Sequence, residues 1–145
     1  MSFEYHNILV ALDGSKGSDR AFEKAVDIAR RNNSNLVLSH VIETNLYSSV
    51  EAYDKNTSER LQNDAQALLK TYKDRALKEN IANVITDLEY GSPKVKIAKK
   101  IAPKYDCDLI ICGATGRTAI ERFFIGSVSE HIIRYAEIDV LIVKD

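Results

Sequence analysis

The residues best suited to chemistry follow two apolar runs of the chain. The run at 7–12 is followed by DGS at 13–15, and the run at 109–112 is followed by GATGR at 113–117. A further glycine and serine open GSVS at 126–129, and nine residues separate Gly116 from Gly126. The combined spacing is G-x2-G-x9-G-S, which indicates a loop that can hold phosphate groups.

This spacing predicts an anion site built mainly from the backbone. Glycine lets the chain approach a phosphate closely and adopt positive φ, and successive N–H groups in a turn can form a nest. A helix starting at Gly126 would add unpaired N–H donors and the positive end of its dipole. The hydroxyls of Ser127 and Ser129 can donate to phosphate oxygens. Because the pattern lacks the lysine of a Walker A loop and is not G-x-G-x-x-G, P-loop and Rossmann dinucleotide sites are disfavoured.

These segments need a scaffold that brings strand ends together, and the hydrophobic pattern predicts one. Short apolar runs alternate with helical periodicity along the whole chain, and Ser92 is the expected N-cap of the third helix. The expected strands are 7–12, 36–42, 84–90, 109–112 and 140–143, and the expected helices are 15–31, 58–80, 93–103 and 126–136. Such alternation predicts right-handed crossovers between parallel strands.

The predicted fold class is therefore α/β, a doubly wound five-stranded parallel sheet with helices on both faces. In this Rossmann-like arrangement the strand order is 3-2-1-4-5. Ligands of such folds bind beyond the carboxyl ends of the strands, where the strand order reverses. We therefore expect the functional residues to lie directly after strands.

Composition excludes several other classes of protein. The 145 residues include 20 basic and 21 acidic side chains, for a net charge of −1. This length predicts one domain over 1–145, which can bury roughly 70% of its surface without a metal or disulfide. The balanced charge argues against non-specific nucleic-acid binding. Since no apolar run approaches the about 20 residues of a spanning helix and no apolar leader begins the chain, we expect a cytoplasmic protein with no membrane partner.

The two cysteines are expected to be structural. Cys107 and Cys112 are five positions apart, which would place them on opposite faces of a strand, too poorly placed to pair. We interpret both as small buried apolar side chains.

Three segments of the chain resemble the universal stress protein family. They are NILVALDGS at 7–15, DLIICGATGR at 108–117 and GSVSEHIIRYAEIDVLIV at 126–143. The resemblance runs through essentially the whole chain in the same order, and G-x2-G-x9-G-S is the signature of the members that bind ATP. The resemblance therefore implies ATP as the ligand and a nucleotide-dependent stress or regulatory role.

The resemblance also implies roles for individual residues. Asp13 would accept hydrogen bonds from the ribose hydroxyls, although an Asx turn is the alternative interpretation of this residue. The backbone of Val41 would contact the adenine edge, and Gly113 would lie against the ribose. Arg117 or Arg122 would add positive charge. The cofactor-binding set at the phosphates would be Gly116, Gly126, Ser127, Val128 and Ser129, with Mg²⁺ or Mn²⁺ carried by the triphosphate.

Residues for efficient catalysis are sparse. The three histidines are scattered, and we interpret His40 as a hydrogen-bonded strand-end residue. Phosphoryl transfer needs an organised base and charge clamps, and no candidate base follows a strand near the phosphate loop. The first hypothesis is a nucleotide-binding module with at most slow hydrolysis. A true ATPase or a phosphotransferase that modifies Ser127, Ser129 or Thr115 stays open, as does a dimeric interaction protein with a vestigial site.

The last apolar run predicts an association surface. Val140–Val143 would form an edge of the sheet, and an uncovered apolar edge tends to pair with another strand. Antiparallel pairing with the same strand of a second copy would close it under two-fold symmetry. We expect a homodimer, which the family resemblance also implies.

Overall fold

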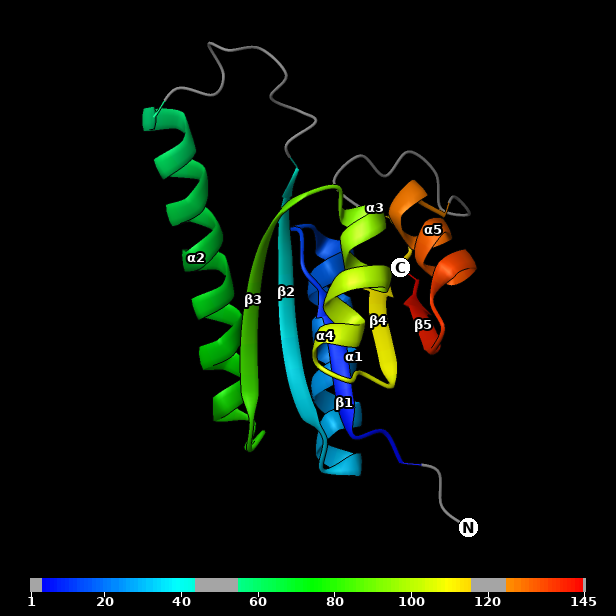
Figure 1. The fold of residues 1–145 in the computed structure, drawn as a ribbon. Helices are drawn as coiled ribbons and strands as arrows, with labels where there is room; N and C mark the ends of the chain where they lie inside the picture. The colour runs from blue at the N-terminus through cyan, green and yellow to red at the C-terminus, as the bar shows by residue number, and fades with distance from the viewer. Residues whose placement is uncertain (1–3, 44–54, 116–124, 145) are drawn as a thin grey trace.

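Five parallel strands form one sheet in the order β3-β2-β1-β4-β5 (Figure 1), which confirms the predicted fold class. The computed structural model describes residues 4–43, 55–115 and 125–144. The strands are β1 (Asn7–Ala11), β2 (Asn35–Glu43), β3 (Val84–Gly91), β4 (Leu109–Gly113) and β5 (Asp139–Val143). The helices are α1 (Lys16–Asn32), α2 (Lys55–Lys78), α3 (Pro93–Lys96), α4 (Ala102–Lys104) and α5 (Ser127–Tyr135), with a π-helical turn (Ile97–Ile101) joining α3 to α4.

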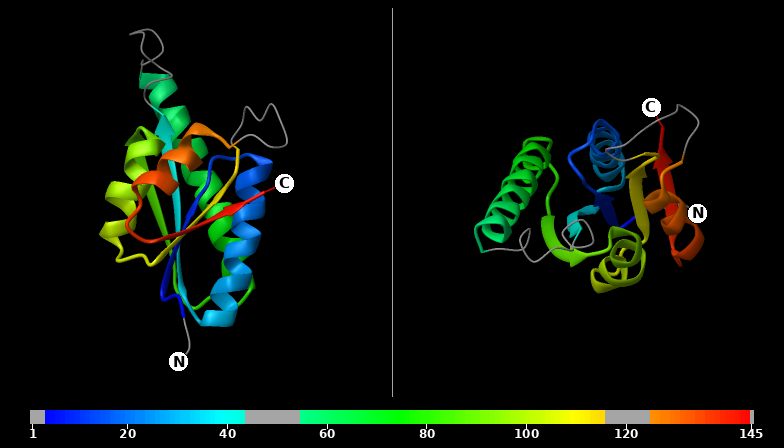
Figure 2. Two further views of the ribbon diagram at one scale, coloured as in Figure 1. Left: turned by 90° about the vertical axis from the view of Figure 1, so that its right-hand side faces the viewer. Right: turned by 90° about the horizontal axis from the view of Figure 1, so that it is seen from above.

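The sheet separates two apolar layers, each covered by its own helices (Figure 2). On β1, Ile8 and Val10 face the layer formed with α1 and α2, whereas Leu9 faces the layer formed with the π-helical turn, α4 and α5. All three side chains are fully buried, because a central parallel strand is covered on both faces. Each such aliphatic side chain contributes about 1.5–3 kcal/mol through its removal from water.

Local residues explain where the helices begin and end. Ser15 is the N-cap of α1, where its Oγ accepts a hydrogen bond from the Ser18 N–H at 3.1 Å. Asn33 ends that helix in the left-handed conformation, with φ 55°. Ser92 precedes α3 as predicted, but its side chain makes no capping hydrogen bond. The helix that was expected to stop near Pro103 includes this residue, because α4 runs to Lys104. The π-helical turn ends just before α4, and Pro103 has no N–H to donate.

Side-chain amides join the amino ends of the strands. Asn83 Nδ2 donates to Asn35 Oδ1 at 2.9 Å, and Asn35 Nδ2 donates to Asn7 Oδ1 at 2.9 Å. The carboxylate of Asp108, before β4, accepts the N–H groups of His6 and Asn7 at 2.8 and 3.0 Å. The amino end of the sheet is therefore held together by side-chain hydrogen bonds.

Both cysteines are buried and free, as predicted, but their relative placement differs from the prediction. Cys107 lies before β4 rather than within it, and its side chain joins the same apolar layer as Cys112. Burial raises the pKa of each thiol to about 12, so both stay protonated at neutral pH. Within 4–43, 55–115 and 125–144, none of the helices combines the length and the apolar character needed to cross a membrane.

Candidate functional site

The structure brings the segments after β1 and β4 together with the start of α5. These two strands are neighbours in the sheet, with Ile8 opposite Leu109 and Val10 opposite Ile111. The Gly126 N–H, just before α5, donates to the Ala114 carbonyl at 2.7 Å. The predicted gathering of strand ends is therefore present where the strand order reverses.

Two glycines allow the first turn of α1 to touch the end of β4. A Cβ on Gly113 would lie 2.8 Å from both the carbonyl carbon and the oxygen of Gly17. A Cβ on Gly17 would in turn lie 2.8 Å from the Thr115 carbonyl oxygen. The contact is backbone against backbone, so neither position tolerates a side chain without displacement. Sequence reasoning did not identify Gly17, although a glycine in the first turn of a helix is itself an unusual choice.

The turn after β1 is organised by its own side chains. Asp13 Oδ1 accepts the Ser15 N–H at 2.9 Å, which is the Asx turn considered from the sequence. Gly14 has φ 83°, a conformation that favours glycine. The Ser18 hydroxyl lies 3.3 Å from the Asp13 nitrogen, which donates to it. The carboxylate of Asp13 is thus oriented by the turn, at the carboxyl end of β1, where a fold of this class is expected to bind its ligand in a crevice.

The start of α5 has amides that make no helical hydrogen bond within the described part of the chain, but it does not present every predicted hydroxyl. The first helical hydrogen bond runs from the Glu130 N–H to the Gly126 carbonyl at 3.0 Å, so the amides of residues 127–129 precede the helical ladder. Ser127 is exposed, whereas Ser129 is only 3% exposed. The Ser129 hydroxyl is within 2.8 Å of the Ala114 carbonyl and 3.0 Å of the Gly126 carbonyl, both of which can only accept. Ser129 therefore ties the helix to the end of β4, and its hydroxyl proton is already used.

The remaining residues of the predicted set divide into two groups. Val128 is half-buried against the apolar layer that contains Leu9. Gly116, Arg117 and Arg122 lie outside the described residues. The structure therefore describes residues 113–115 and 125–129 of this segment but not residues 116–124.

The end of β2 lies at the same edge of the sheet. Val41 is 7% exposed and its side chain belongs to the apolar layer that contains Leu9. β1 stops pairing with β2 at Ala11, opposite Ser39, so β2 continues past the point where β1 turns away. His40 Nδ1 lies 2.7 Å from the Leu12 carbonyl, which agrees with the interpretation of His40 as a hydrogen-bonded strand-end residue.

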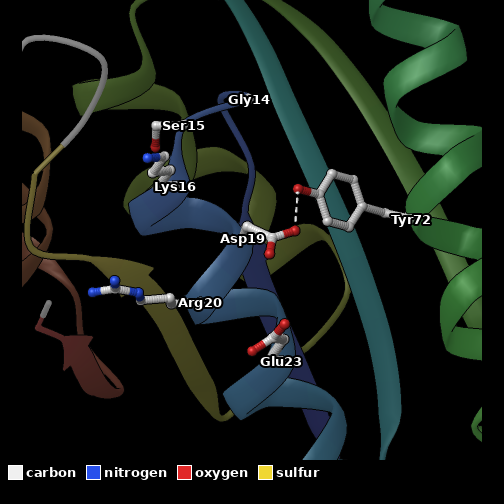
Figure 3. A pocket seen from close by; sticks show the side chains of 7 residues that line it. All are labelled: Gly14, Ser15, Lys16, Asp19, Arg20, Glu23 and Tyr72. Atoms are coloured by element: carbon white, nitrogen blue, oxygen red, sulfur yellow. Dashed lines mark hydrogen bonds between the residues drawn. The ribbon is translucent and has the colours of Figure 1, made fainter.

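A hollow of about 390 Å³ adjoins the turn after β1 (Figure 3). Tyr72 reaches over from α2, and its hydroxyl donates to Asp19 Oδ1 at 2.8 Å, whereas Arg20 extends to the other side of α1. The residues lining the hollow are Gly14, Ser15, Lys16, Asp19, Arg20, Glu23 and Tyr72. Sequence reasoning identified only the turn residues at its edge, because the others look like an ordinary solvated helix face.

A charged network stabilises one wall of this hollow. Arg75 donates to Asp19 Oδ1 at 2.7 Å, and its guanidinium lies 4.7 Å from the centre of the Phe22 ring. The hydrogen bond from Arg75 holds the pKa of Asp19 below its usual value. Burial, aided by the bond to Asp19, raises the pKa of Tyr72 to about 12. The network joins α2 to α1 near the site. Among the described residues, no group of three metal-ligating side chains converges here or elsewhere.

Comparisons with known proteins agree on one family. A model described as "Universal stress protein family" matches residues 4–144. A putative universal stress protein of Staphylococcus saprophyticus is 49% identical over 140 residues, covering 97% of this chain and 84% of that protein.

Solved structures give the same result for the fold. Universal stress protein UspA from Lactobacillus plantarum is similar with a TM-score of 0.85 at 29% identity, covering 99% of this chain and 100% of that one. A universal stress protein solved in complex with cAMP is similar with a TM-score of 0.74 at 25% identity, covering 98% of both chains.

Proposed function

This chain belongs to the universal stress protein family, and from that premise we propose that it binds an adenine nucleotide, with ATP as the principal ligand. The observation that carries the proposal is the junction of Gly126 with Ala114. It places the free amides at the start of α5 beside the end of β4, in the crevice that the Asp13 turn borders. The similar structure solved with cAMP supports the choice of an adenine nucleotide over other anions.

Backbone groups carry most of the proposed phosphate binding. The amides of residues 127–129 and the exposed Ser127 hydroxyl would donate to phosphate oxygens, aided by the positive end of the α5 dipole. We include Gly116 and Arg117 in the phosphate site on the basis of the sequence motif alone. Ser129 contributes its amide, because its hydroxyl is engaged with Ala114. A site of this kind needs no basic surface, which is consistent with the net charge of −1.

The base and ribose would lie across β1 and β2. Asp13 would accept hydrogen bonds from ribose hydroxyls, with its carboxylate held in place by the Ser15 N–H. Gly113 would lie against the ribose, while its missing side chain lets the first turn of α1 approach the end of β4. The backbone of Val41 would contact the adenine edge.

A divalent cation would enter with the nucleotide. No described cluster of carboxylates, histidines or cysteines fits a resident metal site. Mg²⁺ or Mn²⁺ would therefore be held mainly by the triphosphate, where it neutralises phosphate charge. The chain's part is to bind the phosphates through N–H groups rather than to supply ligands to the ion.

We propose a binding module that responds to nucleotide, with at most slow hydrolysis. Among the described residues near the crevice, Asp13 is the one carboxylate that follows β1 directly, and it is engaged in the turn. Rapid multiple turnovers of ATP with Mg²⁺ would contradict this and would favour the ATPase or phosphotransferase alternative.

Pairing of β5 between two copies is part of the same proposal. β5 forms one edge of the sheet, and the side chains of Val140–Val143 are only half-buried in the single chain. Ile133 and Tyr135, at the end of α5, are 49% and 47% exposed. Light scattering should give the mass of a homodimer at micromolar concentration, and a monomer mass would overturn this part.

The direct test of ligand identity uses the purified protein without added nucleotide. Mass spectrometry of released small molecules, followed by calorimetric titration with ATP, ADP and cAMP, should detect an adenine nucleotide. Gly126 has φ −66°, which any residue can adopt, so Gly126→Glu should fold normally yet repel the phosphates. Failure of the wild type to bind any of the three ligands would favour the vestigial-site alternative.

A further inference from the structure

The hydrogen-bond ladder between β1 and β2 ends one bond earlier than the register allows. Leu12, just after β1, still donates its N–H to the Ser39 carbonyl at 2.8 Å. In a regular parallel ladder, the next bond would run from the Val41 N–H to the Leu12 carbonyl. No such bond joins Val41 to Leu12 in the part of the chain that the structure describes, and pairing stops at Ala11.

A side chain takes the place of the missing bond. His40 Nδ1 lies 2.7 Å from the Leu12 carbonyl oxygen. A carbonyl oxygen can only accept, so Nδ1 carries the proton and donates. His40 stands opposite Leu12, one position beyond the last strand pair at Ala11 and Ser39. Its imidazole is therefore next to the carbonyl that Val41 would otherwise use.

Because His40 bonds the Leu12 carbonyl in place of Val41, the Val41 backbone is left directed at the proposed nucleotide site. Backbone groups of successive strand residues point alternately to the two neighbouring strands, and Ser39 points to β1. The N–H and carbonyl of Val41 therefore also point to the β1 side, past the residue at which β1 ends. Val41 is 7% exposed, and backbone groups this close to the interior favour a hydrogen-bonding partner.

We propose that His40 is a positioning residue for recognition of the base. By occupying the Leu12 carbonyl, His40 keeps the Val41 N–H out of the ladder and leaves the Val41 N–H and carbonyl available to the adenine edge. Adenine carries an amino donor at N6, where guanine carries a carbonyl acceptor. The Val41 backbone therefore discriminates between the two bases. This inference rests on the proposed function, because it assigns a residue to the base end of the same site.

Two variants separate positioning from simple packing. In His40→Ala, the Leu12 carbonyl is released and can accept the Val41 N–H, so the ladder should extend by one bond. In His40→Asn, the side-chain amide nitrogen is attached to Cγ, as Nδ1 is in histidine, and can donate to the same carbonyl. We expect the asparagine variant to behave as the wild type and the alanine variant to differ.

The first measurement is calorimetric titration with ATP, GTP and inorganic tripolyphosphate. His40→Ala should bind ATP about tenfold more weakly than the wild type, as expected for one hydrogen bond to the base. Its affinity for GTP and tripolyphosphate should be unchanged, and His40→Asn should restore the preference for ATP. Equal weakening toward all three ligands, or identical behaviour of the two variants, would overturn the inference.

The second measurement needs no ligand. Amide hydrogen exchange at Val41 should slow in His40→Ala relative to the wild type, because the N–H gains the Leu12 carbonyl as partner. If ATP binds and exchange at Val41 is the same in both proteins, this inference is wrong while the proposed function stands. If exchange slows as expected but the wild type binds no adenine nucleotide, the proposed function is wrong, and the role of His40 in base recognition is overturned with it.

Discussion

Gly17 and Gly113 meet backbone to backbone, so that a Cβ on Gly113 would lie 2.8 Å from the carbonyl group of Gly17. The two residues are far apart in sequence, one in the first turn of α1 and the other at the end of β4. Their contact sets the distance between the start of α1, which follows the Asp13 turn, and the segment after β4. The geometry of the proposed site therefore depends on the absence of two side chains.

Substitution of either glycine should destabilise the protein. Gly113→Ala and Gly17→Ala each place a methyl group against backbone that cannot move away by changing rotamer, at a cost of about 1–3 kcal/mol. Both should also weaken ATP binding, since α1 must shift from β4. Gly126→Ser is the matched control for stability, because Gly126 has ordinary N-cap angles (φ −66°, ψ 161°) that serine prefers. Urea unfolding measures the free energy of unfolding of the three variants, which should be lower for Gly113→Ala and Gly17→Ala than for Gly126→Ser. A Gly113→Ala variant as stable as the wild type would contradict the close contact.

Ser127 and Ser129 should give opposite results. Ser129→Ala removes a buried hydroxyl that binds the Ala114 carbonyl at 2.8 Å, so unfolding free energy should fall by about 1 kcal/mol. Ser127→Ala alters an exposed hydroxyl and should leave stability unchanged within about 0.5 kcal/mol. Under the proposed function, Ser127→Ala should weaken ATP binding. Thermal unfolding and ATP titration of both variants test these two predictions. A loss of stability confined to Ser127→Ala would contradict the structural role of Ser129 and the ligand-binding role of Ser127.

The amide chain at the amino ends of the strands should matter for stability but not for ligand binding. Asn35→Ala removes the hydrogen bonds to Asn7 and Asn83 at once, and we expect a loss of about 1–2 kcal/mol. ATP affinity should be unchanged, because the site lies at the opposite end of the sheet. Asn63→Ala, an exposed change on α2, should have little effect or be slightly stabilising. A fall in ATP affinity at constant stability in Asn35→Ala would be inconsistent with this placement.

The Asp19–Arg75 pair predicts a specific dependence of stability on pH. Arg75 lowers the pKa of Asp19 in the folded state, so the pair stabilises the fold above the unfolded pKa of about 4. That contribution is lost as the pH falls through the folded value. The stability difference between wild type and Asp19→Asn should therefore be present near neutral pH and shrink below about pH 4.

The expected difference is modest, and it has a matched control. Arg75 and Asp19 are 40% and 38% exposed, so solvent and salt screen their attraction. Asp27→Asn removes a more exposed carboxylate on the same helix, paired with Arg31 at 3.2 Å, and should change stability less. Urea unfolding across this pH range measures both. A difference for Asp19→Asn that stays constant or grows in acid would contradict the sign of the pKa shift.

Much of the scaffold could be predicted from local pattern. The apolar runs at 7–12 and 109–112 correspond to β1 and β4, which are buried on both faces. The expectation that the segments after β1 and β4 meet could also be made from the sequence, because in a parallel sheet all carboxyl ends lie on one edge. The start of α3 after Ser92 could be predicted as well, but the π-helical turn that separates α3 from α4 could not.

The residues that shape the site emerged only from contacts between distant segments. His40 was expected to be hydrogen-bonded, but its partner Leu12 follows from the register of β1 against β2. Ser129 belonged to the predicted phosphate set, yet its hydroxyl turns inward to Ala114. Gly17 belongs to none of the sequence motifs, so its contact with β4 could not be predicted from the sequence.

The family, the alternation of strands and helices, and the edge of the sheet at which we propose that a ligand binds could all be predicted from the amino-acid pattern. Those properties depend on hydrophobic periodicity and on glycines at characteristic spacing, both of which are local. Only the tertiary structure decided which polar groups remain available at that edge. A hydroxyl or N–H group is available only if no other segment accepts its proton, and strand register and helix packing decide which segments meet.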